Sequence, residues 1–142
     1  MKSLVDLEKK INSELTTKIN DSKMNHGQLY IEIDSEDLLD VSLFLKTNKD
    51  TKFRQLIDIT AVDYLFLSHE FNQRILINYF INENEVVPTL TKIFPSANWM
   101  EREVFDMYGV KFKDHPDLRR ILTDYEFEGY PLRKDFPLTG KF

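Results

Sequence analysis

The chain has 142 residues, of which 42% are hydrophobic and 30% charged, and its formal net charge is −5. This length suits one domain with a real hydrophobic core, and the composition is that of a globular chain. The sequence has no cysteine, which excludes disulfides, iron–sulfur ligation by thiolate and a thiol nucleophile, and its three histidines offer little for a zinc site. Its acidity excludes the basic footprint of a non-specific nucleic-acid binder, and no run approaches the roughly 20 apolar residues that span a bilayer.

Hydrophobic periodicity predicts alternating helices and strands in the first eighty residues. Leu4, Leu7 and Ile11 recur at helical spacing behind Ser3, a residue suited to cap a helix. A turn signal at 25–27 follows. The next predicted elements are a strand at 28–34, a helix that Asp34 or Ser35 caps and that runs to about Lys46, a strand at 56–60, and a hairpin with arms at 64–67 and 75–80.

The second half has fewer elements with clear boundaries. After a polar loop at 82–85, Pro88 fits the first turn of a short helix at 89–94. Asn98 followed by Glu101 resembles a capping box, and Gly109 stands where a left-handed helix cap belongs. The sequence therefore predicts a second, better marked helix that starts near Asn98 and ends at Gly109.

Regular periodicity fades from Lys113 onward, where His-Pro, Gly-Tyr-Pro, Phe-Pro and Thr-Gly are turn or extended signals. The aromatic and leucine content of this stretch argues against simple disorder. The prediction is an α+β fold: a two-layer sandwich of a mixed or antiparallel sheet with helices packed on it, followed by an extended irregular C-terminal segment. Residues 1–112 form the α+β domain, and residues 113–142 form a docking segment of that same domain.

Charges inside the predicted helix at 98–108 raise the first question about function. On a helical wheel Glu101 falls within the apolar arc, whereas Arg102, Glu103 and Asp106 lie on the opposite side. A buried carboxylate needs a cation or several hydrogen-bond donors. Glu101 is expected to cap its own helix, to pair with Arg119 or Arg120, or to do both. Arg102 and Asp106 are expected to form a weak surface pair.

Three other charged groups allow alternative functions. Asp114, His115 and Asp117 could serve a small free-standing acid–base enzyme, although a structural or interface histidine is the commoner case. The two consecutive arginines could bind an anion. The run Arg133-Lys134-Asp135 is either a solvated loop or an anchor onto a partner. These residues on their own name no partner.

The order of these motifs resembles a known family. Glu101-Arg102-Glu103, then Asp106-Met107-Tyr108, His115 and Arg119-Arg120-Ile121-Leu122 resemble the signature of the NuoC-type, or thirty-kilodalton, subunit of respiratory complex I. The likeness continues through LTDYEFEGYPLRKDFPLTG at 122–140 and reaches back to LIDITAVDY at 56–64. It is very specific from about 93 to 140, moderate from 53 to 79 and weak before that.

The resemblance implies a non-catalytic structural and assembly subunit of the hydrophilic arm, with no catalytic, cofactor-binding or metal-binding residue of its own. Other subunits would supply NADH, FMN, iron–sulfur and ubiquinone sites, and the chief partner would be the forty-nine-kilodalton, NuoD-type subunit that shapes the quinone site. No nucleic acid and no membrane span are expected. The residues expected to hold the helix and fix the segment on the neighbour are Glu101, Arg102, Glu103, His115, Arg119, Arg120, Asp124, Arg133, Lys134 and Asp135.

The sequence also departs from the family pattern. The stretch between AVDY and the following strand is short, Glu126 stands where relatives usually carry Gly, and Tyr130 where they usually carry His. The chain stops at Phe142, where many relatives continue. The expected location is the matrix side of the mitochondrial inner membrane, with the cytoplasmic side of a bacterial plasma membrane as the alternative. Homologous subunits of a ferredoxin-dependent plastid complex or a membrane-bound hydrogenase are the alternative assemblies.

Overall fold

A five-stranded sheet forms the centre of the computed structural model, which describes residues 3–60, 63–68 (backbone path), 73–137 and 139. The strand order is β1-β2-β5-β4-β3, from Asp21–Asn25, Gln28–Glu32, Gln73–Asn78, Asp63–Ser68 and Gln55–Ile59 respectively. β2 and β5 run parallel, and the other neighbours are antiparallel. The sheet is therefore mixed, as the sequence predicts.

The β1–β2 hairpin shows why one strand was predicted and its neighbour was missed. Leu29 and Ile31 are buried, and they lie level with Ile75 and Ile77 of β5 on the same face of the sheet. β1 is an edge strand with mostly exposed side chains, so it carries no hydrophobic alternation. The turn at His26 and Gly27 has φ values of 48° and 75°, the left-handed pair that tight hairpins require.

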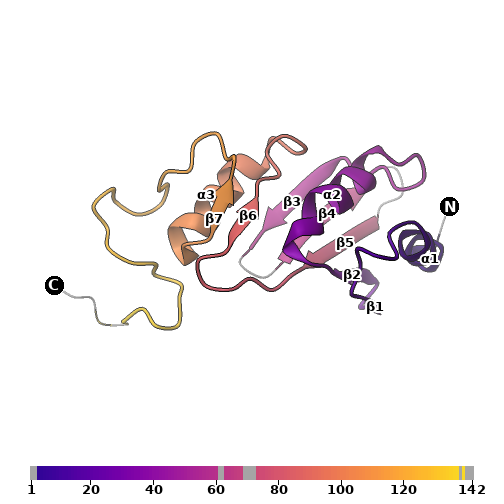
Figure 1. Cartoon of the computed structure of the whole chain (residues 1–142), viewed down its shortest axis with the longest axis horizontal. Helices are drawn as coiled ribbons and strands as arrows, with labels where there is room; N and C mark the ends of the chain where they lie inside the picture. The colour runs from indigo at the N-terminus through magenta and orange to yellow at the C-terminus, as the bar shows by residue number, and fades with distance from the viewer. Residues whose placement is uncertain (1–2, 61–62, 69–72, 138, 140–142) are drawn as a thin grey trace.

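Two helices cover the buried face of the sheet. α1 (Leu4–Glu14) begins with a capping box between Ser3 and Asp6 and buries Leu7 and Ile11. α2 (Leu38–Thr47) follows a short 3-10 turn, η1 (Ser35–Asp37), and lies across the sheet in Figure 1. Its start differs from the prediction, since Asp34 precedes the 3-10 turn without making a side-chain cap. These helices and the sheet share one hydrophobic core, which confirms the two-layer α+β fold.

The third helix lies to one side of the sheet with a small second sheet (Figure 1). α3 (Ala97–Tyr108) packs beside β3. The parallel pair of β6 (Val86–Pro88) and β7 (Lys111–Lys113) forms the second sheet, and β7 contacts α3. The predicted short helix starting at Pro88 is wrong, because Val86 and Val87 are β-branched and Val87 is fully buried within the strand. Residues 90–94 form no more than one hydrogen-bonded turn.

The chain beyond β7 runs as an irregular path along α3 and then away from the sheet (Figure 1). Residues 114–137 contain no helix or strand and consist of turns, bends and irregular backbone. No helix among the described residues is long and apolar enough to cross a membrane. We refer to residues 114–137 as the C-terminal segment.

Candidate docking site on the third helix

The boundaries of α3 follow from its sequence at one end only. Gly109 ends the helix with φ 78°, the left-handed conformation that glycine adopts at least cost. The predicted capping box is wrong, because the helix begins after Ser96 without a side-chain cap and the Glu101 carboxylate points elsewhere. The buried residues of α3 are Ala97, Glu101, Arg102, Val104 and Asp106. Charged side chains are therefore buried on a helix that the wheel divided into one apolar and one polar side.

Asp106 is the centre of the contact between α3 and the C-terminal segment. Its carboxylate is fully buried, and it accepts hydrogen bonds from the backbone N–H groups of Ile121, Leu122 and Thr123 at 2.9, 2.7 and 2.9 Å. The hydroxyl of Thr123 donates to the same carboxylate. One aspartate thus satisfies three consecutive N–H groups of an irregular backbone, which would otherwise be left unpaired.

Burial acts to raise the pKa of Asp106, but the hydrogen bonds from the Thr123 hydroxyl and from the backbone N–H groups at 121–123 outweigh it and hold the pKa well below its usual range. The carboxylate is therefore charged throughout the physiological range. The prediction of a weak surface pair between Arg102 and Asp106 is wrong, because the two side chains have different partners. No sequence signal pointed to this role of Asp106, because the burial of the N–H groups at 121–123 depends on the backbone path of the segment.

Arg120 is the cation that neutralises this carboxylate. Its guanidinium donates to Asp106 Oδ1 at 2.7 Å and to the carbonyl of Gly129 at 2.9 Å. It also lies over the rings of Phe127 and Tyr130, 5.8 and 5.3 Å from the ring centroids. Arg120 therefore ties two turns of the C-terminal segment to the same point on α3. The predicted pairing of this arginine with Glu101 is wrong.

Arg102 fastens the preceding stretch of the C-terminal segment. Its guanidinium donates to the backbone carbonyls of Arg119 and Arg120 at 3.0 and 3.2 Å and lies over the ring of Trp99 at 5.0 Å. Nε and Nη2 thus bind backbone, and Nη1 is 3.9 Å from the carboxylate of Asp117. The predicted role of Arg102 in holding this loop fits these contacts.

Glu101 is buried, as predicted, on the other side of α3. Its carboxyl accepts the backbone N–H of Leu90 at 2.7 Å and lies 2.5 Å from the Thr89 hydroxyl. Burial raises the pKa of Glu101 to about 7, although these hydrogen bonds act in the opposite direction. His115 Nε2 is 3.7 Å away, and the side chains of both residues are 0% exposed. Glu101 joins the β6 side of the fold to α3, rather than pairing with an arginine.

The acid–base enzyme reading finds no support in this geometry. The imidazole of His115 is fully buried and contacts backbone groups at both nitrogens: the carbonyl of Asn98 and the N–H of Asp117. The Asp117 carboxylate is bound by Arg119 at 2.6 and 2.7 Å, which lowers the pKa of Asp117. The imidazole is thus held by backbone groups, and the Asp117 side chain, 38% exposed, is held by Arg119. The anion-binding reading also weakens, since both arginines of the pair already hold carboxylates.

Arg119 differs from Arg120 in exposure, and this difference gives an expected result. The Arg119 side chain is 63% exposed and pairs with Asp117, and exposed ion pairs of this kind contribute little to stability. R119E should therefore shift the urea unfolding midpoint only slightly from that of the parent. R120E is the matched control, because it places a carboxylate against buried Asp106 and should destabilise strongly. Equal losses in both variants would contradict the assignment of Arg120 as the buried partner.

The far end of the C-terminal segment closes on the end of α3. Leu132 N–H donates to the carbonyl of Met107 at 3.1 Å, and Arg133 Nε donates to the carbonyl of Tyr108 at 2.5 Å. Tyr130 lies against Gly109, where an added Cβ would stand 2.6 Å from its ring. The guanidinium groups of Arg120 and Arg133 both lie over this ring. Tyr130 is therefore built into the contact.

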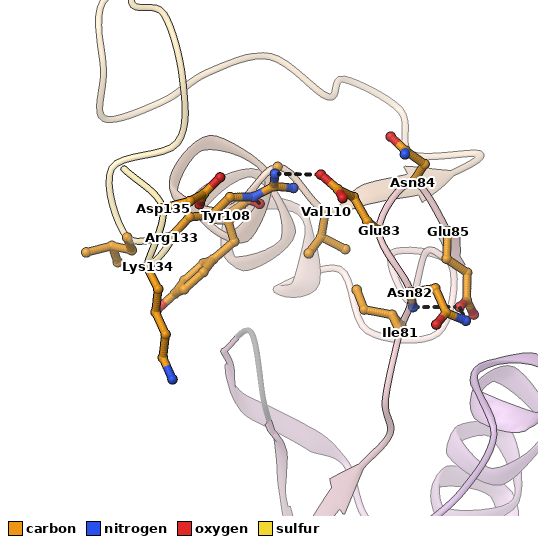
Figure 2. Close-up of a pocket in the computed structure, with 12 residues that line it drawn as sticks. Ile81, Asn82, Glu83, Asn84, Glu85, Tyr108, Val110, Arg133, Lys134 and Asp135 are labelled. Atoms are coloured by element: carbon orange, nitrogen blue, oxygen red, sulfur yellow. Dashed lines mark hydrogen bonds and ion pairs between the residues drawn. The ribbon is translucent and has the colours of Figure 1, made fainter. Parts of the chain in front are cut away.

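A cavity of about 510 Å³ lies between this end of the segment and the loop at 81–85. Figure 2 shows Arg133 reaching Glu83 across it, at 3.6 Å, while Glu85 turns back to Asn82. Lys134 and Asp135 line the same cavity and are exposed.

Glu103, Asp124 and Glu126 are exposed, and φ at Glu126 is not positive. Of the residues expected at an interface, Arg102, His115, Arg120 and Arg133 hold the chain's own segment, and Glu101 holds residues 89–90. The other residues expected there are exposed: Glu103, Arg119, Asp124, Lys134 and Asp135.

Together these contacts define the class of protein: a small α+β domain carrying an irregular segment, which a buried ion pair and hydrogen bonds from buried charged side chains fasten to one helix. The model of the family described as respiratory-chain NADH dehydrogenase, 30 Kd subunit, matches residues 31–142. The chain belongs to this family.

Two similar proteins are both named as the C subunit of an NADH-quinone oxidoreductase. The C subunit of the NADH-quinone oxidoreductase of Ruegeria pomeroyi is 51% identical over 125 residues, covering 80% of this chain and 62% of the relative. The protein of the same name in Parvibaculum lavamentivorans is 46% identical over 149 aligned residues, covering 97% and 74%. The chain thus spans less than two thirds of the Ruegeria protein's length.

Two solved structures share the fold. A chain of the membrane-bound sulfane sulfur reductase, an archaeal respiratory membrane complex, matches with a TM-score of 0.79 and 25% identity, covering 94% of this chain and 85% of that one. The trypsin-resistant fragment of Nqo5 matches with a TM-score of 0.64 and 22% identity, covering 79% and 98%. The second likeness concerns the fold alone.

Proposed function

We propose that this chain is a non-catalytic structural subunit of the hydrophilic arm of an NADH:quinone oxidoreductase, and that it docks on the quinone-site subunit through α3 and the C-terminal segment. One observation carries the proposal. The segment is fastened to α3 by buried charged groups, while large apolar side chains on the same elements face outward. Trp99, Leu122, Tyr125 and Leu132 are 63, 63, 79 and 55% exposed.

This outward set has the composition of a docking surface. Trp and Tyr are enriched at the energetic centres of interfaces, where apolar contact area is buried around them. Arg119, Asp124 and Lys134 lie exposed on the same segment and supply the charged rim. The segment has no helix or strand after residue 113, so contacts with α3 must fix its conformation. A surface that is already fixed in its bound conformation loses less conformational entropy when a partner binds it.

We further propose that the chain supplies no redox centre. NADH, FMN, iron–sulfur clusters and ubiquinone would be bound by other subunits. The absence of cysteine from the sequence supports this for iron–sulfur clusters. No group of three or more histidine, aspartate or glutamate side chains is placed to hold a metal within the described part of the chain. Metal analysis of the purified chain by mass spectrometry would test the proposal directly.

The docking proposal is tested by a double variant, L122S with Y125S, expressed in the native host. Both side chains are largely exposed, so folding should survive, whereas about 2 kcal/mol or more of binding should be lost if they are central contacts. Detergent-solubilised membranes are run on a native gel, stained for NADH dehydrogenase activity and probed for this chain. The variant should leave the large active band.

V5S with M24S is the matched control, because these residues are also exposed apolar side chains but lie on α1 and β1. The control should stay in the active band. If the L122S/Y125S chain assembles as well as the control, the docking surface is elsewhere. If the parent chain itself runs alone at low mass, the subunit proposal fails.

The likeness to a chain of the archaeal sulfane sulfur reductase favours one second candidate, a homologous subunit of a related membrane complex that does not oxidise NADH. The same gel separates the two, since the chain would then migrate in a large band without NADH dehydrogenase activity. For location, we propose the matrix face of the mitochondrial inner membrane or the cytoplasmic face of a bacterial plasma membrane. The relatives named above are bacterial, and this supports the second location.

A further inference from the structure

Glu101 is a buried carboxyl group whose two hydrogen-bond donors are neutral. It is 0% exposed, and its two oxygens are served by the Leu90 N–H and the Thr89 hydroxyl. The arginines of this region are engaged elsewhere, since Arg102 binds backbone carbonyls and Arg120 binds Asp106. A carboxylate in this place would be a buried charge without a counter-ion, which is costly.

His115 is the nearest titratable group, and its geometry fits a neutral ring. Nδ1 accepts the backbone N–H of Asp117 at 3.0 Å, so Nδ1 carries no proton. Nε2 lies 3.1 Å from the carbonyl of Asn98 and therefore donates to it. A charged imidazole would place its Nδ1–H against the N–H of Asp117. In this conformation His115 is not the counter-ion of Glu101.

The other charged groups near this site do not supply a counter-ion for Glu101. Asp117 lies on the far side of the imidazole and is neutralised by Arg119, with Arg102 3.9 Å away. From the β6 side, Thr89, Leu90 and Thr91 contribute hydroxyl and backbone groups. A proton on the carboxyl group removes the unpaired charge without any movement of these elements.

The hydroxyl groups of Thr89 and Thr91 can form hydrogen bonds with Glu101 in both its ionised and its protonated state. Thr89 Oγ1 lies 2.5 Å from Glu101 Oε2 and 3.0 Å from Thr91 Oγ1. When Glu101 is ionised, the Thr89 hydroxyl donates to it. When Glu101 is protonated, the carboxylic acid donates to Thr89 Oγ1, and the Thr89 hydrogen turns to Thr91. Thr91 is partly exposed, so this short chain of hydroxyls connects the buried carboxyl group to solvent.

We propose that Glu101 is a proton-binding site, which exchanges its proton with solvent through Thr89 and Thr91. Deprotonation of Glu101 weakens the contact between α3 and the loop that carries His115 and Asp117. An ionised Glu101 would attract the His115 Nε2–H away from Asn98, or recruit a second proton onto the ring and break the bond from Asp117. The burial that raises the pKa of Glu101 to about 7 agrees with this geometry. The proposal does not depend on assembly with any partner.

The test is a titration of the full chain labelled with ¹³C at the glutamate side-chain carboxyl groups. Glu101 Cδ, assigned through its own backbone, should titrate near neutrality, whereas an unperturbed glutamate titrates near pH 4.3. A Glu101 midpoint in the ordinary range would overturn the proposal.

E101Q gives an independent readout, because glutamine keeps the shape but binds no proton. A carboxyl whose folded pKa is raised above the unfolded value stabilises at low pH, and this stabilisation is lost as pH rises from about 4.5 to 7. In urea titrations the folding equilibrium constant of E101Q relative to the parent should rise roughly fifty- to a hundredfold from pH 5 to pH 8. E103Q, an exposed site on the same helix, should show no such rise. An unchanged E101Q ratio contradicts the proposal, and the parent titration decides it if E101Q does not fold.

Discussion

D106N is expected to destabilise the chain by about 3–5 kcal/mol, the usual cost of removing one partner of a buried ion pair. The asparagine side chain cannot neutralise Arg120, and its amide nitrogen would face at least one of the donors that now point at the carboxylate. Those donors are the N–H groups of residues 121–123 and the Thr123 hydroxyl. The loss should be measured as a lower urea midpoint and as faster proteolysis within residues 118–137.

The pH dependence of this loss has a defined sign. The folded pKa of Asp106 is lowered, so the stabilisation is fully present above the unfolded value of about 3.9 and fades as pH falls through the lowered pKa. The difference between D106N and the parent should therefore be constant from pH 5 to 8 and shrink in acid. E103Q, whose carboxyl is exposed on the same helix, is the control and should change stability by less than about 0.5 kcal/mol. A D106N chain as stable as E103Q would show that Asp106 does not hold the segment.

G109A is the second change with a large expected effect. Alanine at φ 78° adopts the left-handed backbone at a cost of about 1–2 kcal/mol. Its Cβ would also stand 2.6 Å from the Tyr130 ring, and overpacking of this kind costs about 1–3 kcal/mol more. Together these effects should lower the free energy of unfolding by about 2–5 kcal/mol in urea titrations.

Gly27 separates the two effects. It has φ 75° and nothing within 4 Å of an added Cβ, so G27A carries the backbone strain without a clash. G109A should therefore destabilise by more than G27A. The combination G109A with Y130A measures whether removal of the ring lowers the further cost of the alanine. Equal losses for G27A and G109A would mean that Tyr130 moves aside freely and does not lock the end of α3.

The sequence predicted the elements whose buried apolar residues recur at one helical or strand spacing. β2 was found because one face of it is buried, and α3 was found because Gly109 ends it. β1 was missed, since a mostly exposed edge strand has no apolar pattern to read. β6 was misread because a Pro was assigned to the start of a helix, while the two valines before it pack as a strand.

The candidate site was harder to predict because α3 is covered on two sides. A helical wheel assumes one buried face, which correctly placed Glu101 inside. Asp106 was assigned to solvent because the cover on its side is an irregular segment without periodicity. The choice between Arg119 and Arg120 depends on the path of that backbone, which fixes one side chain against Asp106 and leaves its neighbour 63% exposed.

The parallel pairing of β2 with β5 also constrains the order in which the chain can fold. β5 is the last strand of the main sheet in sequence, yet it bonds to both β2 and β4 at the centre of the sheet. During synthesis the β1–β2 hairpin and the strands β3 and β4 emerge first, as two pieces with no strand to join them. The sheet becomes continuous once Asn78 has left the ribosome, and the apolar faces of both pieces must wait until then for their shared core.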